Sequence, residues 1–584
     1  MAANGLAADG SSAATDADAS AANNNHDTNS TPDASRQHST LPPHYNSFPR
    51  YHHTIHQPGP PPHASSSSNS SSGKQIPAAT ARVLGPDLLR GLLMAFMAMD
   101  HLGIALRPWP HGLGNGPERD GEPVTRWNRP AAYIVRSLTH LCAPGFALLL
   151  GMGVAYLGRA RRHGKGWSAR RLLRYFALRM AVLTLVMIAQ SLAMTAGQVW
   201  FLNIVLFALA VDYFLAGAVW LALDETERRL TDLLTRKMLL RRQQHEEQDA
   251  AAAVAADNEA DAEQQPLLLL AARQQGGPQV STAETKAARI SWHVHNTLLL
   301  LLSVVTIFWN IWLSRDQGQC AVPGASDTAH VVVVGAPGGW PESEPDRYWW
   351  LHLWFWETSA PGVLSAFPPL AWLSFALVGV LYGRAMTIRD NNHPQRSTPR
   401  RLLGHLLAGL VFAVIFVLTR LLHIGNLSEH CLQTPENRAH PSRNQYLASP
   451  AAFFYTVKYP PDVAFWALTL AANFFLLAGL GRIPAAFAKR WLVVLLDFGT
   501  ASLFFYVVHM PVVFLTGWAM CAVFGHETDQ EEGPPGVFVS VKSIDNVFGV
   551  FAVWTLCMLI MWPLCRWYGR FKFGKPANSL WRMF

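Results

Sequence analysis

The chain has 584 residues, of which 50% are hydrophobic and 15% charged, and its formal net charge is +8. Residues 1–75 are almost wholly polar, so the remainder is too apolar for a soluble protein and indicates an integral membrane protein. The basic residues gather between apolar runs, a pattern that sets membrane topology and does not indicate nucleic-acid binding. Six cysteines without CxxC or Cys/His spacing indicate no disulfide scaffold, and no metal is expected.

The N-terminal segment, residues 1–80, is rich in Ala, Asn, Ser, His and Pro. It cannot bury enough apolar surface to offset the entropy of ordering the chain. We therefore expect a disordered cytosolic tail. Its scattered histidines are better explained by a solvated low-complexity segment than by a metal site.

Ten apolar runs follow, each long enough to cross a bilayer. They lie near residues 84–106, 131–157, 173–195, 199–222, 293–313, 362–384, 402–423, 462–481, 491–517 and 547–565. Every second loop is rich in Lys and Arg, so the positive-inside rule places both termini in the cytosol. The predicted fold is an all-α polytopic membrane helix bundle over residues 81–570. A cytosolic low-complexity loop at 225–290 interrupts it, and residues 571–584 form a short cytosolic tail.

The first run carries charged residues at both of its ends. Asp87 and Arg90 lie near its start, and Asp100 and His101 lie near its end. A charge near the bilayer centre costs at least about 2.5–3.5 kcal/mol, so such residues usually mark a function. Asp87 and His101 are separated by roughly 21 Å of helix rise and lie on about the same face. One helix thus presents polar groups near each membrane surface to the same interior cavity.

Other polar side chains are predicted at the depth of His101. His140 and His509 lie in the same half of the bilayer, and histidine can take up a proton or carry an acyl group. Asp100 is expected to contact Arg136 or His140. The remaining residues at this depth are Asn310, Arg420 and His423. A functional cavity is favoured over the alternative that each residue only hydrogen-bonds between helices.

The loops on the non-cytosolic side contain two further features. Cys320 and Cys431 both lie there, where oxidation allows a disulfide between them. Asn426 begins an Asn-Leu-Ser sequon close to the end of its helix, so both a glycosylated and an unmodified side chain stay open.

Residues Glu263 to Leu268 in the cytosolic loop read EQQPLL. This stretch looks like the acidic dileucine signals that sorting adaptors use to send membrane proteins to lysosomes or vacuoles. The alternative is an inert linker. We expect a vacuolar or lysosomal membrane, with the plasma membrane or the endoplasmic reticulum as alternatives.

Several stretches carry a resemblance to a known family. They are Arg82, Asp87, Leu89-Arg90-Gly91 and His101 in the first run, together with LMAFMAMDH (93–101), SLTHLCAPGFALLLGMG (137–153), KYPPD (458–462) and SLFFYVVHMP (502–511). In this order they resemble the heparan-alpha-glucosaminide N-acetyltransferase-like catalytic domain family. That family belongs to the membrane-bound acyltransferase superfamily and is related to the acyltransferase-three proteins.

The resemblance implies transfer of an acetyl or other acyl group from cytosolic acetyl-CoA to a glycan or other amine or hydroxyl acceptor on the lumenal or outer side. The residues implied for catalysis are His101, Asp100, His140 and His509. Arg82 and Arg90 would bind the phosphates of the donor, with Asp87 orienting Arg90 or capping the start of the helix. The residues expected in the substrate cavity are Arg136, Arg420, His423 and Lys458.

Two mechanistic alternatives stay open for His101, a general base acting on the acceptor and a nucleophile that forms an acetyl-imidazole. His111, in an aromatic-rich loop, is an alternative catalytic histidine. A multi-pass transporter of a polar solute is the main rival function, although the two halves of the chain show no convincing repeat. The expected partners are membrane lipid, the acceptor and a sorting adaptor, and a homodimer stays open.

Overall fold

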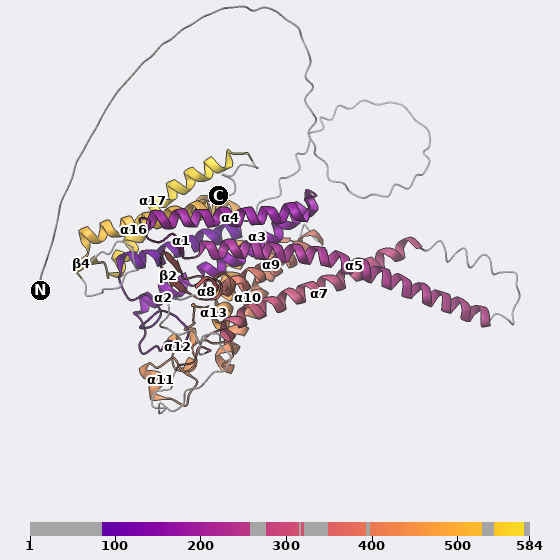
Figure 1. Ribbon diagram of the computed structural model, residues 1–584, viewed down its shortest axis with the longest axis horizontal. Helices are drawn as coiled ribbons and strands as arrows, with labels where there is room; N and C mark the ends of the chain where they lie inside the picture. Colours follow the sequence, from indigo (N-terminus) through magenta and orange to yellow (C-terminus); the bar gives the residue numbers. More distant parts are fainter. Residues whose placement is uncertain are drawn as a thin grey trace, which may run out of the picture. The chain divides into compact units, whose positions relative to one another are not determined.

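The computed structural model describes residues 84–256, 276–314, 317–320, 349–392, 397–527 and 542–576 (Figure 1). The expected N-terminal tail, Arg82 and the EQQPLL stretch lie outside these residues. In the described part of the chain, ten helical segments are long and apolar enough to cross a membrane. The length and composition of these helices therefore confirm the predicted helical architecture and agree with a multi-pass membrane protein.

The long helices follow the predicted runs in order. They are α1 (Gly85–Leu106), α2 (Pro130–Thr139), α3 (Cys142–Arg159), α4 (Ala169–Met194), α5 (Leu206–Ala256), α7 (Gly276–Trp312), α9 (Pro369–Asn392), α10 (Ser397–Leu422), α13 (Val463–Gly481), α16 (Ser502–Phe524) and α17 (Val547–Phe573). The short helices are η1 (Ala160–Gly164), α8 (Trp349–Phe355), α11 (Pro435–Ala439), η4 (Gln445–Leu447), α12 (Pro450–Phe454), α14 (Ala485–Trp491) and α15 (Val493–Thr500).

The run near 131–157 is broken into α2 and α3, between Thr139 and Cys142. Pro144 explains the break, because its ring lacks an N–H and would clash with the carbonyl of His140 in a continuous helix. The run near 491–517 is also divided, with α15 ending at Thr500 and α16 beginning at Ser502. Both breaks lie beside residues that form the cavities described below.

Two of the apolar runs begin as strands and not as helices. β1 (Phe201–Asn203) pairs in parallel with β3 (Val363–Ser365), which pairs antiparallel with β2 (Thr358–Ala360). The Asn203 side chain donates to Ser365 Oγ at 2.9 Å and to the Phe367 carbonyl at 2.6 Å, which joins the two segments. A second pair of strands comprises β4 (His526–Glu527) and β5 (Lys542–Ser543).

The described flanks of the loop expected at 225–290 are helical. α5 continues to Ala256 and α7 begins at Gly276, and the two helices pack side by side (Figure 1). Ser291 on α7 donates to the backbone oxygen of Glu227 on α5 at 2.8 Å. The described flanks of the expected loop are therefore held together by the packing of α5 against α7.

Helices α1 and α15 approach each other at the backbone. A Cβ on Gly91 would lie 1.9 Å from the Leu495 oxygen, and one on Gly499 would lie 1.9 Å from the Asp87 oxygen. Close packing of small residues is a common way for membrane helices to associate, because lipid provides no hydrophobic driving force between them. This contact fixes the end of α1 that carries Asp87 and Arg90.

The predicted pairing of Cys320 with Cys431 is confirmed by an S–S distance of 2.03 Å. The Asn426 amide is buried and donates to the Thr419 carbonyl at 3.0 Å and to Glu429 Oε1 at 2.9 Å. A glycan has no access to this nitrogen, so the structure favours the unmodified side chain.

Candidate functional site

A cavity of about 230 Å³ lies beside the last third of α1. Its charged and histidine side chains come from three segments, with Asp100 and His101 on α1, His111 in the following loop, and Lys458 before α13. The other walls come from α3, α16 and the strands β1 and β3. The structure therefore brings four charged or titratable side chains from distant parts of the sequence to one cavity.

His101 and His509 are in direct contact, which agrees with the expectation that they lie at the same depth in the bilayer. Their Nδ1 and Nε2 atoms lie 2.8 Å apart, and both side chains are buried. The Nδ1 of His509 faces only carbonyl oxygens, those of Tyr506 at 2.7 Å and Phe505 at 3.1 Å. Because a carbonyl can only accept, His509 Nδ1 must carry a hydrogen.

These contacts assign the tautomers of both rings. With Nδ1 protonated, neutral His509 accepts through Nε2, so the hydrogen of that bond belongs to His101 Nδ1. The lone pair of neutral His101 is then on Nε2. This nitrogen has no hydrogen-bond partner among the described residues, and His101 lines the cavity. The arrangement produces a base whose free nitrogen is available to a bound molecule.

Asp100 lines the cavity and also belongs to a buried ion-pair network with Arg136 and Glu118. Its Oδ1 accepts from Arg136 at 2.8 Å and from Thr139 at 3.2 Å, which confirms the expected contact with Arg136. Arg136 also donates two bonds of 2.9 Å to the two oxygens of Glu118. His140 Nε2 lies 3.2 Å from Glu118 Oε1, so His140 belongs to the same network, and it is not among the residues that line the cavity.

Glu118 was not singled out from the sequence. Its side chain is fully buried, and it comes from the loop between α1 and α2, where neighbouring residues are also acidic. Burial alone would raise its pKa, but the Arg136 guanidinium and the hydrogen bonds from His140 and Arg136 hold the pKa well below its usual range. The only signal in the sequence was the need of the buried Arg136 for a carboxylate partner.

Lys458 brings an ammonium group to the cavity. The residue is only 4% exposed, and its backbone nitrogen donates to the Glu118 carbonyl at 3.0 Å. Its Nζ lies 5.5 Å from the Phe367 ring centre and 5.0 Å from that of Tyr459. No carboxylate contacts Nζ among the described residues, so this cation is held by aromatic faces and directed to the cavity.

A second cavity, of about 470 Å³, lies at the other end of α1. Three cationic residues line it, Arg90, Arg179 and Lys572, and no carboxylate does so among the described residues. Asp87 orients Arg90 as predicted, since Asp87 Oδ1 accepts from Arg90 at 3.1 Å. Phe146 lines both cavities, so the two are separated by a shared wall.

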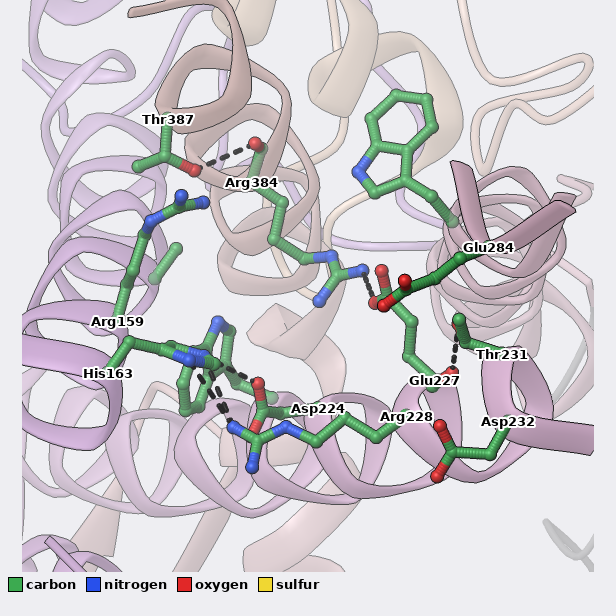
Figure 2. A pocket seen from close by; sticks show the side chains of 13 residues that line it. Arg159, His163, Asp224, Glu227, Arg228, Thr231, Asp232, Glu284, Arg384 and Thr387 are labelled. Carbon is green, nitrogen blue, oxygen red and sulfur yellow. Dashed lines mark hydrogen bonds and ion pairs between the residues drawn. The ribbon is translucent and has the colours of Figure 1, made fainter. Parts of the chain in front are cut away.

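A third cavity, of about 530 Å³, lies between α3, α5, α7 and α9 (Figure 2). Asp224 accepts from His163 and Arg228 at 2.9 Å each, and Figure 2 shows these three side chains gathered on one side. Arg384 on α9 binds Glu227 on α5 on the opposite side. The Asp224–His163 and Glu227–Arg384 pairs join α5 to neighbouring helices, and we assign them a structural role.

Of the four residues expected in the substrate cavity, only Lys458 is among its lining residues, and Arg136 lies in the ion-pair network instead. The other two lie elsewhere. Arg420 donates to Asn426 Oδ1 at 2.8 Å and to the Tyr455 carbonyl at 2.7 Å, within the packed segment between α10 and α13. His423 bonds Glu429 at 2.9 Å at a half-exposed position. Neither residue lines the cavity beside His101, because the backbone turns away after α10 and their depth along the chain does not fix their direction.

Comparison with known protein-family models and with curated proteins finds no match to this chain.

Proposed function

We propose that this chain is an integral membrane acyltransferase. It moves an acetyl or related acyl group from acetyl-CoA on the cytosolic side to an amine or hydroxyl acceptor that enters from the lumenal or outer side. This is the activity implied by the resemblance to the heparan-alpha-glucosaminide N-acetyltransferase-like family.

One observation carries the proposal, the pair of cavities that meet at Phe146. The cavity near the start of α1 is lined by cations, and the one near its end contains His101. Arg90 and His101 are separated by about 16 Å of helix rise, comparable to an extended pantetheine arm. The proposal therefore assigns the charged donor to the cation-lined cavity and proton transfer to the cavity at the other end of the helix.

The residues present fit acetyl-CoA. Arg90, Arg179 and Lys572 provide positive charge for its phosphates, and Arg side chains suit bidentate phosphate contacts. When bound, acetyl-CoA supplies an acyl group activated as a thioester. The apolar wall at Phe146 suits the uncharged part of such a molecule.

His101 is the proposed catalytic base. Its unprotonated Nε2 would accept the proton of the acceptor's amine or hydroxyl, while His509 holds the ring in that tautomer through Nδ1. Lys458 is proposed to stabilise negative charge that develops on the acyl oxygen, since no carboxylate in the described part of the chain contacts its ammonium. Arg136 forms an ion pair with Asp100, which balances the negative charge of this carboxylate beside the cavity.

The charge pattern and the disulfide support the proposed orientation. The basic loops follow the second, fourth, sixth and eighth spans, which favours the cytosol for that side. Cys320 and Cys431 lie on the other side, and disulfides persist in oxidising compartments. The base His101 then lies near the lumenal or outer surface and the cation-lined cavity near the cytosol.

The test is release of free CoA thiol from acetyl-CoA by the purified full-length protein in lipid nanodiscs. We expect turnover by the wild type, and a loss of about 10²- to 10⁴-fold in kcat for His101→Gln. His163→Gln is the matched control, because His163 lies at the third cavity. Equal rates for His101→Gln and the wild type would refute the role of His101. Absence of any binding or turnover of acetyl-CoA would favour the transporter.

A further inference from the structure

The lining of the cavity beside His101 is mostly apolar. Its charged and ionisable groups are few, and the polar lining consists of Asp100, His101, His111, Thr139, Cys142, Lys458 and Tyr459. The remaining wall is hydrophobic and includes Ile104, Leu202, Leu364, Met510 and Phe514. A molecule that fills this space therefore meets apolar side chains over most of its surface.

The volume sets the size of that molecule. A dry cavity of about 150 Å³ is known to hold one benzene molecule, which is roughly 25 Å³ per carbon atom. By the same ratio the cavity of about 230 Å³ holds roughly nine non-hydrogen atoms. An acetyl group alone fills only a small part of this space.

A free amino sugar matches the wall poorly. Its hydroxyl groups surround the whole ring, so several would face Leu202, Leu364 and Phe514 without a hydrogen-bond partner. Each buried polar group that loses its partners weakens binding. A single nucleophile on an apolar body avoids this loss, because only its reactive end needs the polar groups.

We propose that the acceptor is amphipathic, with one hydroxyl or amine on an aliphatic or aromatic body of roughly nine non-hydrogen atoms. This inference rests on the proposed acyltransferase function and narrows its substrate class. The acceptor oxygen or nitrogen forms the bond to the acyl carbon and the carbon–sulfur bond breaks. The acceptor's proton passes to His101 Nε2 and then to the departing thiolate, so atoms and charge balance.

The position of the apolar wall assigns it to the acceptor and not to a long acyl chain on the donor. Ile104 follows His101 on α1, one turn farther from Arg90, and Phe514 lies about one turn beyond Met510 on α16. The hydrophobic space therefore extends past the base, on the side away from the cation-lined cavity.

Binding without donor is the first measurement. The full-length protein in nanodiscs is titrated with 2-phenylethanol and 2-phenylethylamine, which match the cavity in size, and with glucosamine. We expect the two aromatic probes to bind saturably and to raise the unfolding temperature, and glucosamine to do neither. Leu364→Gln should weaken binding of the aromatic probes by about tenfold. Leu240→Gln on α5, an exposed position outside the cavity, should leave it unchanged.

Turnover distinguishes this inference from the proposed function. We expect the aromatic probes to accelerate thiol release from acetyl-CoA more than glucosamine does at equal concentration. If glucosamine is the better acceptor, the inference is overturned and the acyltransferase function stands. If the aromatic probes bind but no thioester is cleaved, the proposed function fails and the amphipathic site stands. Faster cleavage of octanoyl-CoA, with an effect of Leu364→Gln on that donor only, would assign the wall to the acyl chain and overturn the inference.

Discussion

Replacing His509 tests whether it acts by holding the tautomer of His101. In His509→Phe the ring volume and the contact with Phe505, whose ring centre lies 5.4 Å away, are kept, but the acceptor for His101 Nδ1–H is lost. A buried donor left without a partner costs about 1–3 kcal/mol. His101 avoids this cost by changing its tautomer or rotating, and either change removes the lone pair from its working position.

The free-energy cost of the unpartnered His101 donor determines the expected loss of kcat. With a factor of ten per 1.36 kcal/mol, kcat should fall by about 5- to 150-fold. The KM for acetyl-CoA should stay unchanged, because Arg90 lies about 16 Å along the helix from His101. His509→Gln is the matched control, since its amide oxygen can lie near the position of Nε2 and accept the same hydrogen bond. It should retain kcat within about tenfold of the wild type.

The assay is steady-state thiol release by nanodisc-embedded protein, with the unfolding temperature of each variant measured in parallel. A His509→Phe variant with wild-type kcat would refute the tautomer argument. Equal losses in the Phe and Gln variants would also refute it, because they would show that the contact with His101 is not what matters.

Three further predictions follow from the same network and cavities. Glu118→Gln should lower the free energy of unfolding by about 1.5–3 kcal/mol, because the hydrogen bonds of Arg136 to this residue lose their charged acceptor while the ion pair with Asp100 remains, and thermal unfolding in nanodiscs would show this. Since the pKa of Glu118 is depressed in the folded protein, the wild type should keep this stabilisation above about pH 4.5 and lose it as the pH falls further, whereas Glu118→Gln should lack this dependence. Arg179→Gln should raise the KM for acetyl-CoA by about tenfold with little change in kcat, and an unchanged KM would exclude Arg179 from donor binding. Gly499→Ala should separate α1 from α15 and reduce both stability and donor binding, while Gly479→Ala, where no atom lies within 4 Å of the added carbon, should reduce neither through a steric clash.

The sequence predicted the spans well because hydropathy over about twenty residues is a strong signal. It also predicted the Asp87–Arg90 and Asp100–Arg136 contacts and the disulfide. It did not separate β1 and β3 from the helices that follow, since a short apolar run has the same composition in either structure. The break between α2 and α3 was readable in principle from Pro144.

The cavity itself was only partly predictable. Depth along a helix predicted that His101 and His509 lie at the same level, and the structure shows them in contact. The same reasoning wrongly grouped Arg420 and His423 with them, because depth carries no information on the direction of a side chain. Arg179 and Lys572 were missed, since each lies in a basic segment whose charge is explained by topology alone.

Phe146, the residue that both cavities share, has a consequence for the membrane as a barrier. One cavity lies beside the start of α1, the other lies beside its last third, and Phe146 lines both. An aromatic side chain between two cavities can act as a hydrophobic constriction, which excludes hydrated ions by dewetting. Under the proposed function, the cation-lined cavity admits a large charged donor, and the Phe146 ring would then keep hydrated ions from passing between the two cavities.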